Sequence, residues 1–275
     1  MSLQTLSLAH QNARAEIFTQ GAHVSLFHTA SGNEVLFLSK ETCFETGKPI
    51  RGGVPLIFPW FGPRKDDSTS PAHGFARTMQ WQVENTSDHS SSLVLESSNA
   101  TRALWNHNFR LVYTVEIEAE SLHLRLEIHN TGEATFEFET ALHTYFNVSD
   151  VRQIEISGLE GKTYIDKTQN AARLTQSGAI RFEGETDRVY LDSSGPITLR
   201  DGAKTIQIRD LGGVKSSVVW NPWIEKSRAL SDLGDDEWPG FVCIESGVIA
   251  DDAQKIEAGK CYEMAIKIAV AGEIR

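Results

Sequence analysis

The chain has 275 residues, 40% of them hydrophobic, and carries 37 acidic against 26 basic side chains for a formal net charge of −11. This length and composition fit one globular domain that spans residues 1–275. A nucleic-acid partner is not expected, because proteins bind phosphate backbones with Lys and Arg clustered on a basic face. Any anionic substrate must therefore meet a local cluster of arginines.

The first long loop, residues 51–82, combines arginine with glycine and aromatic residues. Arg51 begins the run RGGVPLIFPWFGP, and Arg77 ends the motif HGFAR. Glycine lets the backbone approach a ligand, aromatic rings offer an apolar platform to a sugar, and the planar guanidinium suits phosphate. Neither GxxxxGK[ST] nor GxGxxG occurs, so a nucleotide-binding loop is not indicated. We interpret the two arginines as ligand-binding, with solvated surface charge as the alternative.

Alternating apolar residues predict an all-β fold. One hairpin is expected from residues 109–117 and 122–128, joined at Ala119-Glu120-Ser121, and a second from residues 197–199 and 206–208. The second hairpin contains Asp201-Gly202, which readily takes the positive φ of a tight turn. No segment shows a long period of 3.6 residues.

A second long loop is expected at residues 220–240, where three tryptophans occur. We expect Trp220, Trp223 and Trp238 to pack within this loop, with a platform for a sugar ring as the alternative. The acidic run at residues 235–237 is interpreted as a solvated turn.

Two titratable residues lie at or near the ends of apolar strands. His143 follows Leu142, and by alternation it lies on the opposite face of the strand. Glu245 closes the apolar run at residues 241–244. Because an unpaired buried carboxylate is costly, a hydrogen-bonded structural role and a catalytic base are both open for Glu245. For His143, the alternatives are a solvated polar side chain and the acid of a cleft.

The cysteines and histidines do not predict a disulfide framework or a metal site. Cys43, Cys243 and Cys261 show no CxxC spacing, and the histidines form no HExxH or His-x-His pattern. This cysteine usage fits the reducing cytoplasm. No membrane partner is expected, because no apolar run approaches the ~20 residues of a membrane span.

Six motifs occur in an order that resembles the hexose-6-phosphate mutarotases of the aldose 1-epimerase superfamily. They are RGGVPLIFPWFGP, HGFAR, ALHTYF, GETDRVY, WNPWIEKS and CIESG, which together run from residue 51 to residue 247. The resemblance implies a large antiparallel β-sandwich of the galactose mutarotase-like supersandwich type, with an open cleft. Ala72 stands where some relatives carry a polar residue, which leaves the sugar preference open.

The same resemblance implies the roles of individual residues. Glu245 is expected to be the general base and His143 the general acid. The expected substrate-binding residues are His73 and Asp187 for the sugar hydroxyls and ring, and Arg51 and Arg77 for the phosphate.

The implied reaction exchanges the α and β anomers of a sugar phosphate such as glucose 6-phosphate. One group removes the proton of the C1 hydroxyl while another protonates the ring oxygen, so no cofactor is expected. Two alternatives remain, a non-catalytic carbohydrate-binding or sugar-phosphate-sensing module and a mutarotase for free aldoses. The presence of both His143 and Glu245 disfavours the first, and the role of the two arginines distinguishes the second.

Overall fold

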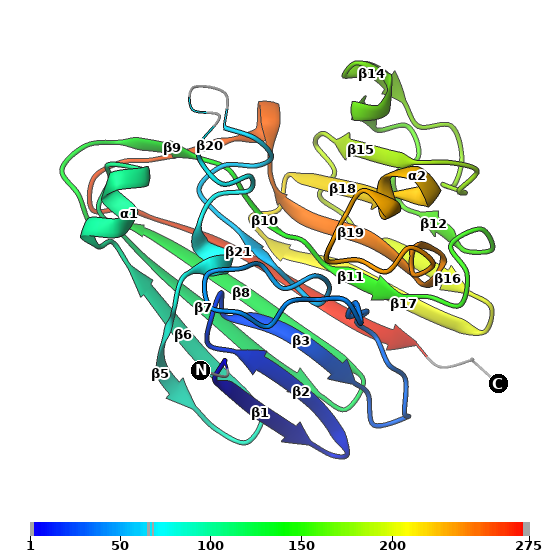
Figure 1. Cartoon of the computed structure of the whole chain (residues 1–275), viewed down its shortest axis with the longest axis horizontal. Helices are drawn as coiled ribbons and strands as arrows, with labels where there is room; N and C mark the ends of the chain where they lie inside the picture. Colours follow the sequence, from blue (N-terminus) through cyan, green and yellow to red (C-terminus); the bar gives the residue numbers. More distant parts are fainter. Residues whose placement is uncertain (1–2, 65–66, 68, 272–275) are drawn as a thin grey trace.

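The structure is a computed structural model that describes residues 3–64, 67 and 69–271. Two large sheets dominate these residues, and their named strands pair antiparallel (Figure 1). In spatial order the first sheet contains β14 (Ala172–Thr175), β13 (Thr163–Asp166), β15 (Thr186–Tyr190), β18 (Ser216–Asn221), β19 (Phe241–Val248), β10 (Thr140–Leu142) and β4 (Leu56–Ile57), and β11 (Tyr145–Asn147) also pairs with β19. The predicted all-β class and antiparallel sandwich are confirmed.

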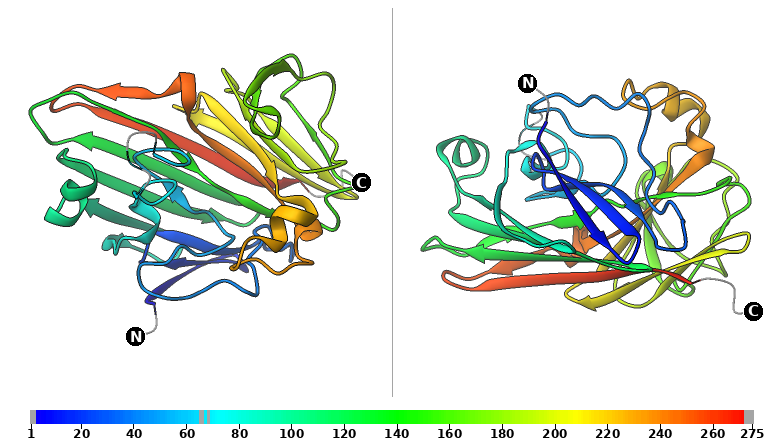
Figure 2. Two further views of the ribbon diagram at one scale, coloured as in Figure 1. Left: turned by 45° about the horizontal axis from the view of Figure 1, so that its top comes forward. Right: turned by 90° about the horizontal axis from the view of Figure 1, so that it is seen from below.

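The second large sheet forms one long layer (Figure 2). Its strands are, in spatial order, β12 (Glu155–Ser157), β16 (Ile197–Asp201), β17 (Lys204–Gly212), β21 (Cys261–Ala271), β8 (Ser121–Asn130), β7 (Phe109–Glu118), β6 (Ser90–Glu96) and β5 (Gln82–Thr86). Two smaller sheets join β1 (Thr5–His10), β2 (Ala13–Phe18) and β3 (His23–His28), and β20 (Gln254–Ile256) with β9 (Phe136–Phe138).

Both predicted hairpins are present. β7 and β8 pair along their full lengths, and the connecting turn is one residue shorter than expected because Ser121 pairs with Glu118. β16 and β17 are joined by a two-residue turn between Asp201 and Lys204, in which Gly202 has a φ of 58°. Gly202 therefore supplies the positive φ of the tight turn at the position that the sequence predicted.

The helices are short. They are α1 (Asn99–Leu104), α2 (Trp223–Arg228) and the 3₁₀ turns η1 (Ala76–Thr78), η2 (Lys167–Gln169), η3 (Trp238–Gly240) and η4 (Ala250–Asp252). No described helix has the length and apolar character needed to span a membrane. Because α2 lies within residues 220–240, the prediction of a plain loop there was incomplete.

The main hydrophobic core joins the two large sheets. It contains the inward residues of β7, β8 and β21 together with Val242, Ile244 and Leu142 of the first sheet. A smaller cluster lies on the other face of the first sheet and includes Cys243 and Val218. Successive side chains of β19 therefore point alternately into the two clusters, and Glu245 lies on the same face of the sheet as Cys243.

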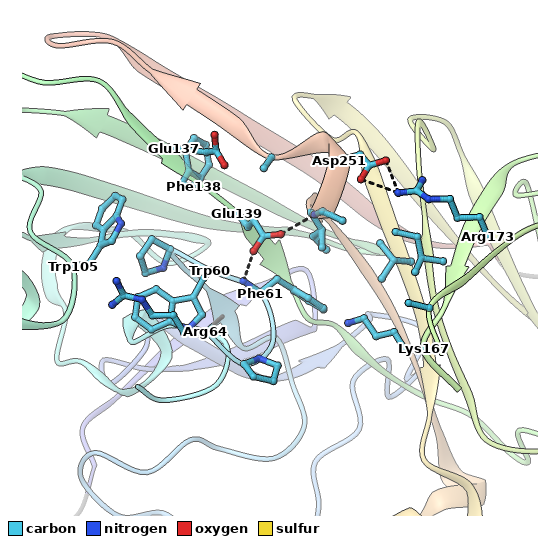
Figure 3. A pocket seen from close by; sticks show the side chains of 18 residues that line it. Trp60, Phe61, Arg64, Trp105, Glu137, Phe138, Glu139, Lys167, Arg173 and Asp251 are labelled. Atoms are coloured by element: carbon cyan, nitrogen blue, oxygen red, sulfur yellow. Dashed lines mark hydrogen bonds and ion pairs between the residues drawn. The ribbon is translucent and has the colours of Figure 1, made fainter. Parts of the chain in front are cut away.

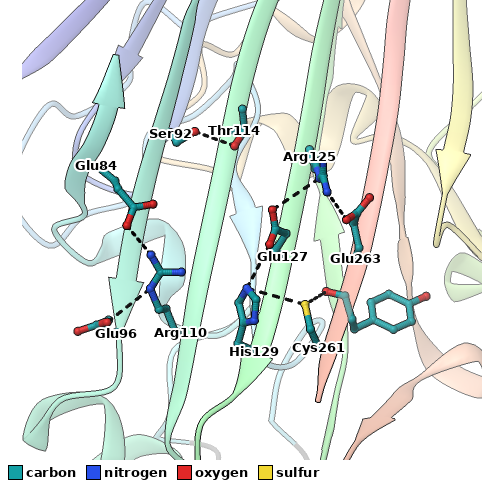
Figure 4. A network of polar contacts seen from close by, with 11 residues as sticks. Glu84, Ser92, Glu96, Arg110, Thr114, Arg125, Glu127, His129, Cys261 and Glu263 are labelled. Atoms are coloured by element: carbon teal, nitrogen blue, oxygen red, sulfur yellow. Dashed lines mark hydrogen bonds and ion pairs between the residues drawn. The ribbon is translucent and has the colours of Figure 1, made fainter. Parts of the chain in front are cut away.

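The outer face of the second sheet carries charged side chains instead. Arg110 forms ion pairs with Glu84 and Glu96, and Arg125 forms them with Glu127 and Glu263 (Figure 4). This face is therefore the solvated side of the sandwich, while the smaller cluster marks the face of the first sheet on which the candidate site is built.

Candidate active site

His143 and Glu245 meet on the first sheet. β10 ends at Leu142, which pairs with Ser246 of β19, so the residues that flank this pair become neighbours. His143 Nε2 lies 3.3 Å from Glu245 Oε1, and the carboxyl side chain is only 1% exposed. The structure thus brings together the two residues expected to act as acid and base.

Burial shifts the two groups in opposite directions. Desolvation is the main reason that the pKa of His143 lies well below its ordinary value, and His73 and Arg77 lower it further. Desolvation also raises the pKa of Glu245 well above its ordinary value. In the described residues, His143 Nδ1 and Glu245 Oε2 are buried without a hydrogen-bond partner. The two shifts favour a neutral imidazole beside a protonated carboxyl group in the empty site, so the pair carries one proton that can move between them.

Aromatic rings fix the orientation of His143. Its imidazole stacks on Tyr145 at a centroid distance of 5.0 Å and meets the edge of Trp220 at 5.9 Å. Trp220 belongs to β18, so the expectation that it packs only within the second loop was wrong. Trp223 and Trp238 do pack against each other, at 4.4 Å.

His73 lies beside this pair, with its ring 5.7 Å from that of His143. Its Nδ1 accepts a hydrogen bond from the Gly62 backbone N–H at 3.3 Å. Burial, followed by Arg77, lowers the pKa of His73 to about 3, so the ring is neutral. With Nδ1 as acceptor, the proton resides on Nε2, which is available to donate to a sugar hydroxyl.

Asp187 lies on the same face, where its β15 position pairs with Trp220. Burial raises the pKa of its carboxyl group above the ordinary value. Lys226 lies 3.9 Å from Asp187 but forms its shorter ion pair, of 2.8 Å, with Glu185. The Asp187 carboxylate is therefore placed to accept hydrogen bonds from a ligand.

The two predicted phosphate-binding arginines differ in their partners. Arg51 Nη2 donates to both Asp232 oxygens, at 2.9 and 3.0 Å, and Nη1 donates to the Tyr145 hydroxyl. Arg77 donates to the Ala72 carbonyl, and within the described part of the chain no carboxylate lies within 4 Å of it. Burial, with a smaller contribution from Arg51, lowers the pKa of Arg77 to about 10. Among the described residues, Arg77 is thus a cation without a carboxylate at ion-pair distance.

Two charged residues of the site had no signal in the sequence. Lys167 lies in η2, and its ammonium group is 4.4 Å from the ring centroid of Phe61, which in turn contacts His73 at 4.8 Å. Asp232 reaches Arg51 across 181 residues of sequence. Neither residue belongs to a recognisable motif.

In the acidic run at residues 235–237, Glu237 accepts hydrogen bonds from Ser39 and Lys40, so the expectation of a solvated turn was wrong for Glu237.

A cavity of about 780 Å³ adjoins this group of residues (Figure 3). Phe61 and Lys167 line it, and they are the same residues that border His73. Glu139 secures the wall by accepting hydrogen bonds from the backbone N–H groups of Phe61 and Ala250. The cavity therefore lies beside the predicted site and not within it, because its lining does not include His143, Glu245, His73, Asp187, Arg51 or Arg77.

A group of three potential metal ligands lies away from the cleft, on the outer face shown in Figure 4. Among the described residues, Glu127, His129 and Cys261 place their donor atoms within 4.8 Å of one another. Arg125 lies 3.6 Å from the Glu127 carboxylate and competes with a cation for it. The group does not contact the His143–Glu245 pair.

The structure thus combines an antiparallel β-sandwich with a buried His–Glu pair beside aromatic rings, an arrangement suited to acid–base chemistry on a bound ligand. The chain belongs to the aldose 1-epimerase family, whose model matches residues 4–269. This membership supports epimerase or mutarotase activity and confirms the family resemblance seen in the motifs.

Individual relatives cover nearly the whole chain. A protein of Escherichia coli (strain K12) named "Putative glucose-6-phosphate 1-epimerase" is 36% identical over 275 residues, or 98% of this chain and 91% of the relative. A relative of the same name in Cenchrus ciliaris is 33% identical and covers 87% of this chain and 76% of its own. The crystal structure of "a putative mutarotase" from Salmonella typhimurium gives a TM-score of 0.90 at 34% identity, covering 99% of this chain and 92% of the other.

Proposed function

We propose that the protein interconverts the α and β anomers of a hexose 6-phosphate, with glucose 6-phosphate as the first substrate to test. The observation that carries this proposal is Arg77, a cation that forms no ion pair with any described residue and lies near a buried acid–base pair. A phosphate group would supply the missing negative charge through charge-assisted hydrogen bonds. The names of the curated relatives agree with this substrate class.

In the proposed mechanism, the shared proton first passes from Glu245 to His143 across their 3.3 Å contact when the sugar binds. Glu245 then takes the proton of the C1 hydroxyl while His143 gives a proton to the ring oxygen. The bond between C1 and the ring oxygen breaks, and C1 becomes an aldehyde. Rotation about the C1–C2 bond then presents the other carbonyl face, and the reverse proton transfers close the ring. Because the pair shares one proton, each half-reaction restores the protonation needed by the other.

The remaining residues hold the substrate in this mechanism. His73 donates from Nε2 and Asp187 accepts from sugar hydroxyls, which fixes the ring against the acid–base pair. Arg77 binds the phosphate together with Arg51. Positioning of this kind converts binding energy into correct alignment of the reacting atoms.

The decisive experiment measures anomer exchange by NMR for glucose 6-phosphate and for glucose. Catalytic amounts of protein should accelerate the first, and a metal chelator should not alter the rate. Arg77→Ala should lower kcat/KM for glucose 6-phosphate by roughly 10- to 100-fold, with a much smaller effect on glucose. Arg110→Ala, on the outer face, is the matched control.

Two outcomes would contradict the proposal. No acceleration with any of several hexose phosphates would favour a binding module. Equal losses on both sugars in Arg77→Ala would favour a mutarotase for free aldoses. The ion pair between Arg51 and Asp232 supports this candidate, because it already neutralises one of the two arginines.

A further inference from the structure

Arg51 already has a carboxylate where the proposed function requires a phosphate. Asp232 accepts from Arg51 Nη2 with both oxygens, and Tyr145 accepts from Nη1. Arg51 Nε is buried without a partner among the described residues. While Asp232 stays in place, its carboxylate therefore already neutralises the guanidinium charge and occupies the Nη2 donors that a phosphate would use.

We propose that Asp232 is an internal counter-ion that the phosphate of the substrate displaces from Arg51, so that it determines how strongly the cleft prefers phosphorylated over neutral sugars. This inference rests on the proposed function and adds a specificity residue to it. Asp232 lies outside the acid–base pair and need not contact the reacting atoms.

The charges at this end of the cleft favour such an exchange. Arg51 and Arg77 with Asp232 sum to +1, and a bound phosphate of charge close to −2 would bring the sum to −1. If Asp232 leaves Arg51 when the phosphate binds, the charges of the two arginines and the phosphate sum to zero. A carboxylate that remained beside the phosphate would repel it, and this repulsion is strong where water is excluded.

The local backbone indicates how Asp232 is released. It sits in a turn between Leu230 and Leu233, and the Leu233 N–H donates to the Leu230 carbonyl. Leu233 is 3% exposed and belongs to the smaller hydrophobic cluster, so the turn is anchored. The Asp232 side chain is 23% exposed. Rotation of the side chain toward water therefore frees Arg51 without opening the loop.

The test compares Asp232→Asn with Asp236→Asn, which makes the same change in net charge at an exposed position of the same loop. The asparagine at 232 retains an oxygen that accepts from Arg51, so the fold should persist. Asp232→Asn should lower KM for glucose 6-phosphate about tenfold and change kcat/KM for glucose less than about threefold. Inorganic phosphate, titrated by calorimetry, should bind about tenfold more tightly. Asp236→Asn should match the wild type in KM for glucose 6-phosphate, in kcat/KM for glucose and in affinity for inorganic phosphate.

Measurements on the wild type and on Asp232→Asn distinguish failure of this inference from failure of the proposed function. A wild type that exchanges glucose but not glucose 6-phosphate overturns the proposed substrate. A wild type that exchanges both, with Asp232→Asn raising KM equally for both sugars, shows that Asp232 merely orients Arg51 and overturns the inference. Unchanged affinity for inorganic phosphate in Asp232→Asn also overturns it, whatever the activity.

Discussion

Replacing Glu245 by glutamine should remove activity and raise stability at the same time. The substitution keeps the size and shape of a side chain that is 1% exposed, so the packing should survive. It removes the group that we propose to exchange a proton with the substrate, and such groups contribute roughly 10²- to 10⁴-fold. The loss should appear mainly in kcat, measured by NMR anomer exchange.

The gain in stability follows from the raised pKa of the buried carboxyl group. Above pH 4.5 the unfolded chain releases the Glu245 proton while the folded protein retains it, so this group lowers the free energy of unfolding as pH rises. The slope reaches about 1.4 kcal/mol per pH unit until the folded pKa is passed. The stability of Glu245→Gln relative to the wild type, measured as the free energy of unfolding, should therefore increase from pH 5 to pH 7.

Urea denaturation at both pH values checks this second expectation. Wild-type turnover in Glu245→Gln would refute the assigned role in catalysis. A variant less stable than the wild type at pH 7, with activity lost, would show that the carboxylate stabilises the fold through contacts that outweigh its burial.

Two further predictions concern stability. Gly74→Ala should lower the free energy of unfolding in urea by about 2–4 kcal/mol, because φ is +69° and the new Cβ would lie 2.0 Å from the Phe58 carbonyl oxygen. Gly32→Ala is the control, with φ +88° and open space around the new Cβ, and should cost about 1 kcal/mol. Equal losses would exclude the close contact as the cause. Burial lowers the pKa of His23 to about 3, so the contribution of this group to the free energy of unfolding should fall as pH drops below 6.5, by up to about 1.4 kcal/mol per pH unit. His23→Asn should flatten this dependence between pH 6.5 and 5, and an unchanged slope would contradict the assignment.

The strands were predictable because their signal is local. Residues 109–128 alternate apolar and polar side chains, and the same alternation places Leu124 and Leu126 in the main core. The Asp201-Gly202 turn was likewise readable from adjacent residues. In contrast, Trp220 was misplaced because its neighbours in sequence are loop-like while its neighbours in space are His143 and Tyr145.

The site was predictable only in part, since its contacts join distant segments. Alternation placed His143 on the face opposite Leu142, but the 3.3 Å approach to Glu245 depends on the pairing of β10 with β19. The family motifs indicated the residues expected to act and to bind. Asp232 and Lys167 lie outside those motifs, and only the folded chain shows them beside Arg51 and Phe61.

The order of strands in the two large sheets also bears on how the chain folds as it is synthesised. β19 lies between β18 and β10, and β21 lies between β17 and β8, so strands from residues 241–271 fill central positions in both sheets. Until these residues leave the ribosome, the partner strands present unpaired edges that favour association with other chains. Pairing across such long separations is also slow. Nascent chains of this protein should therefore expose these edges until residues 241–271 have been synthesised, and Glu245 can join His143 only after β19 has been made.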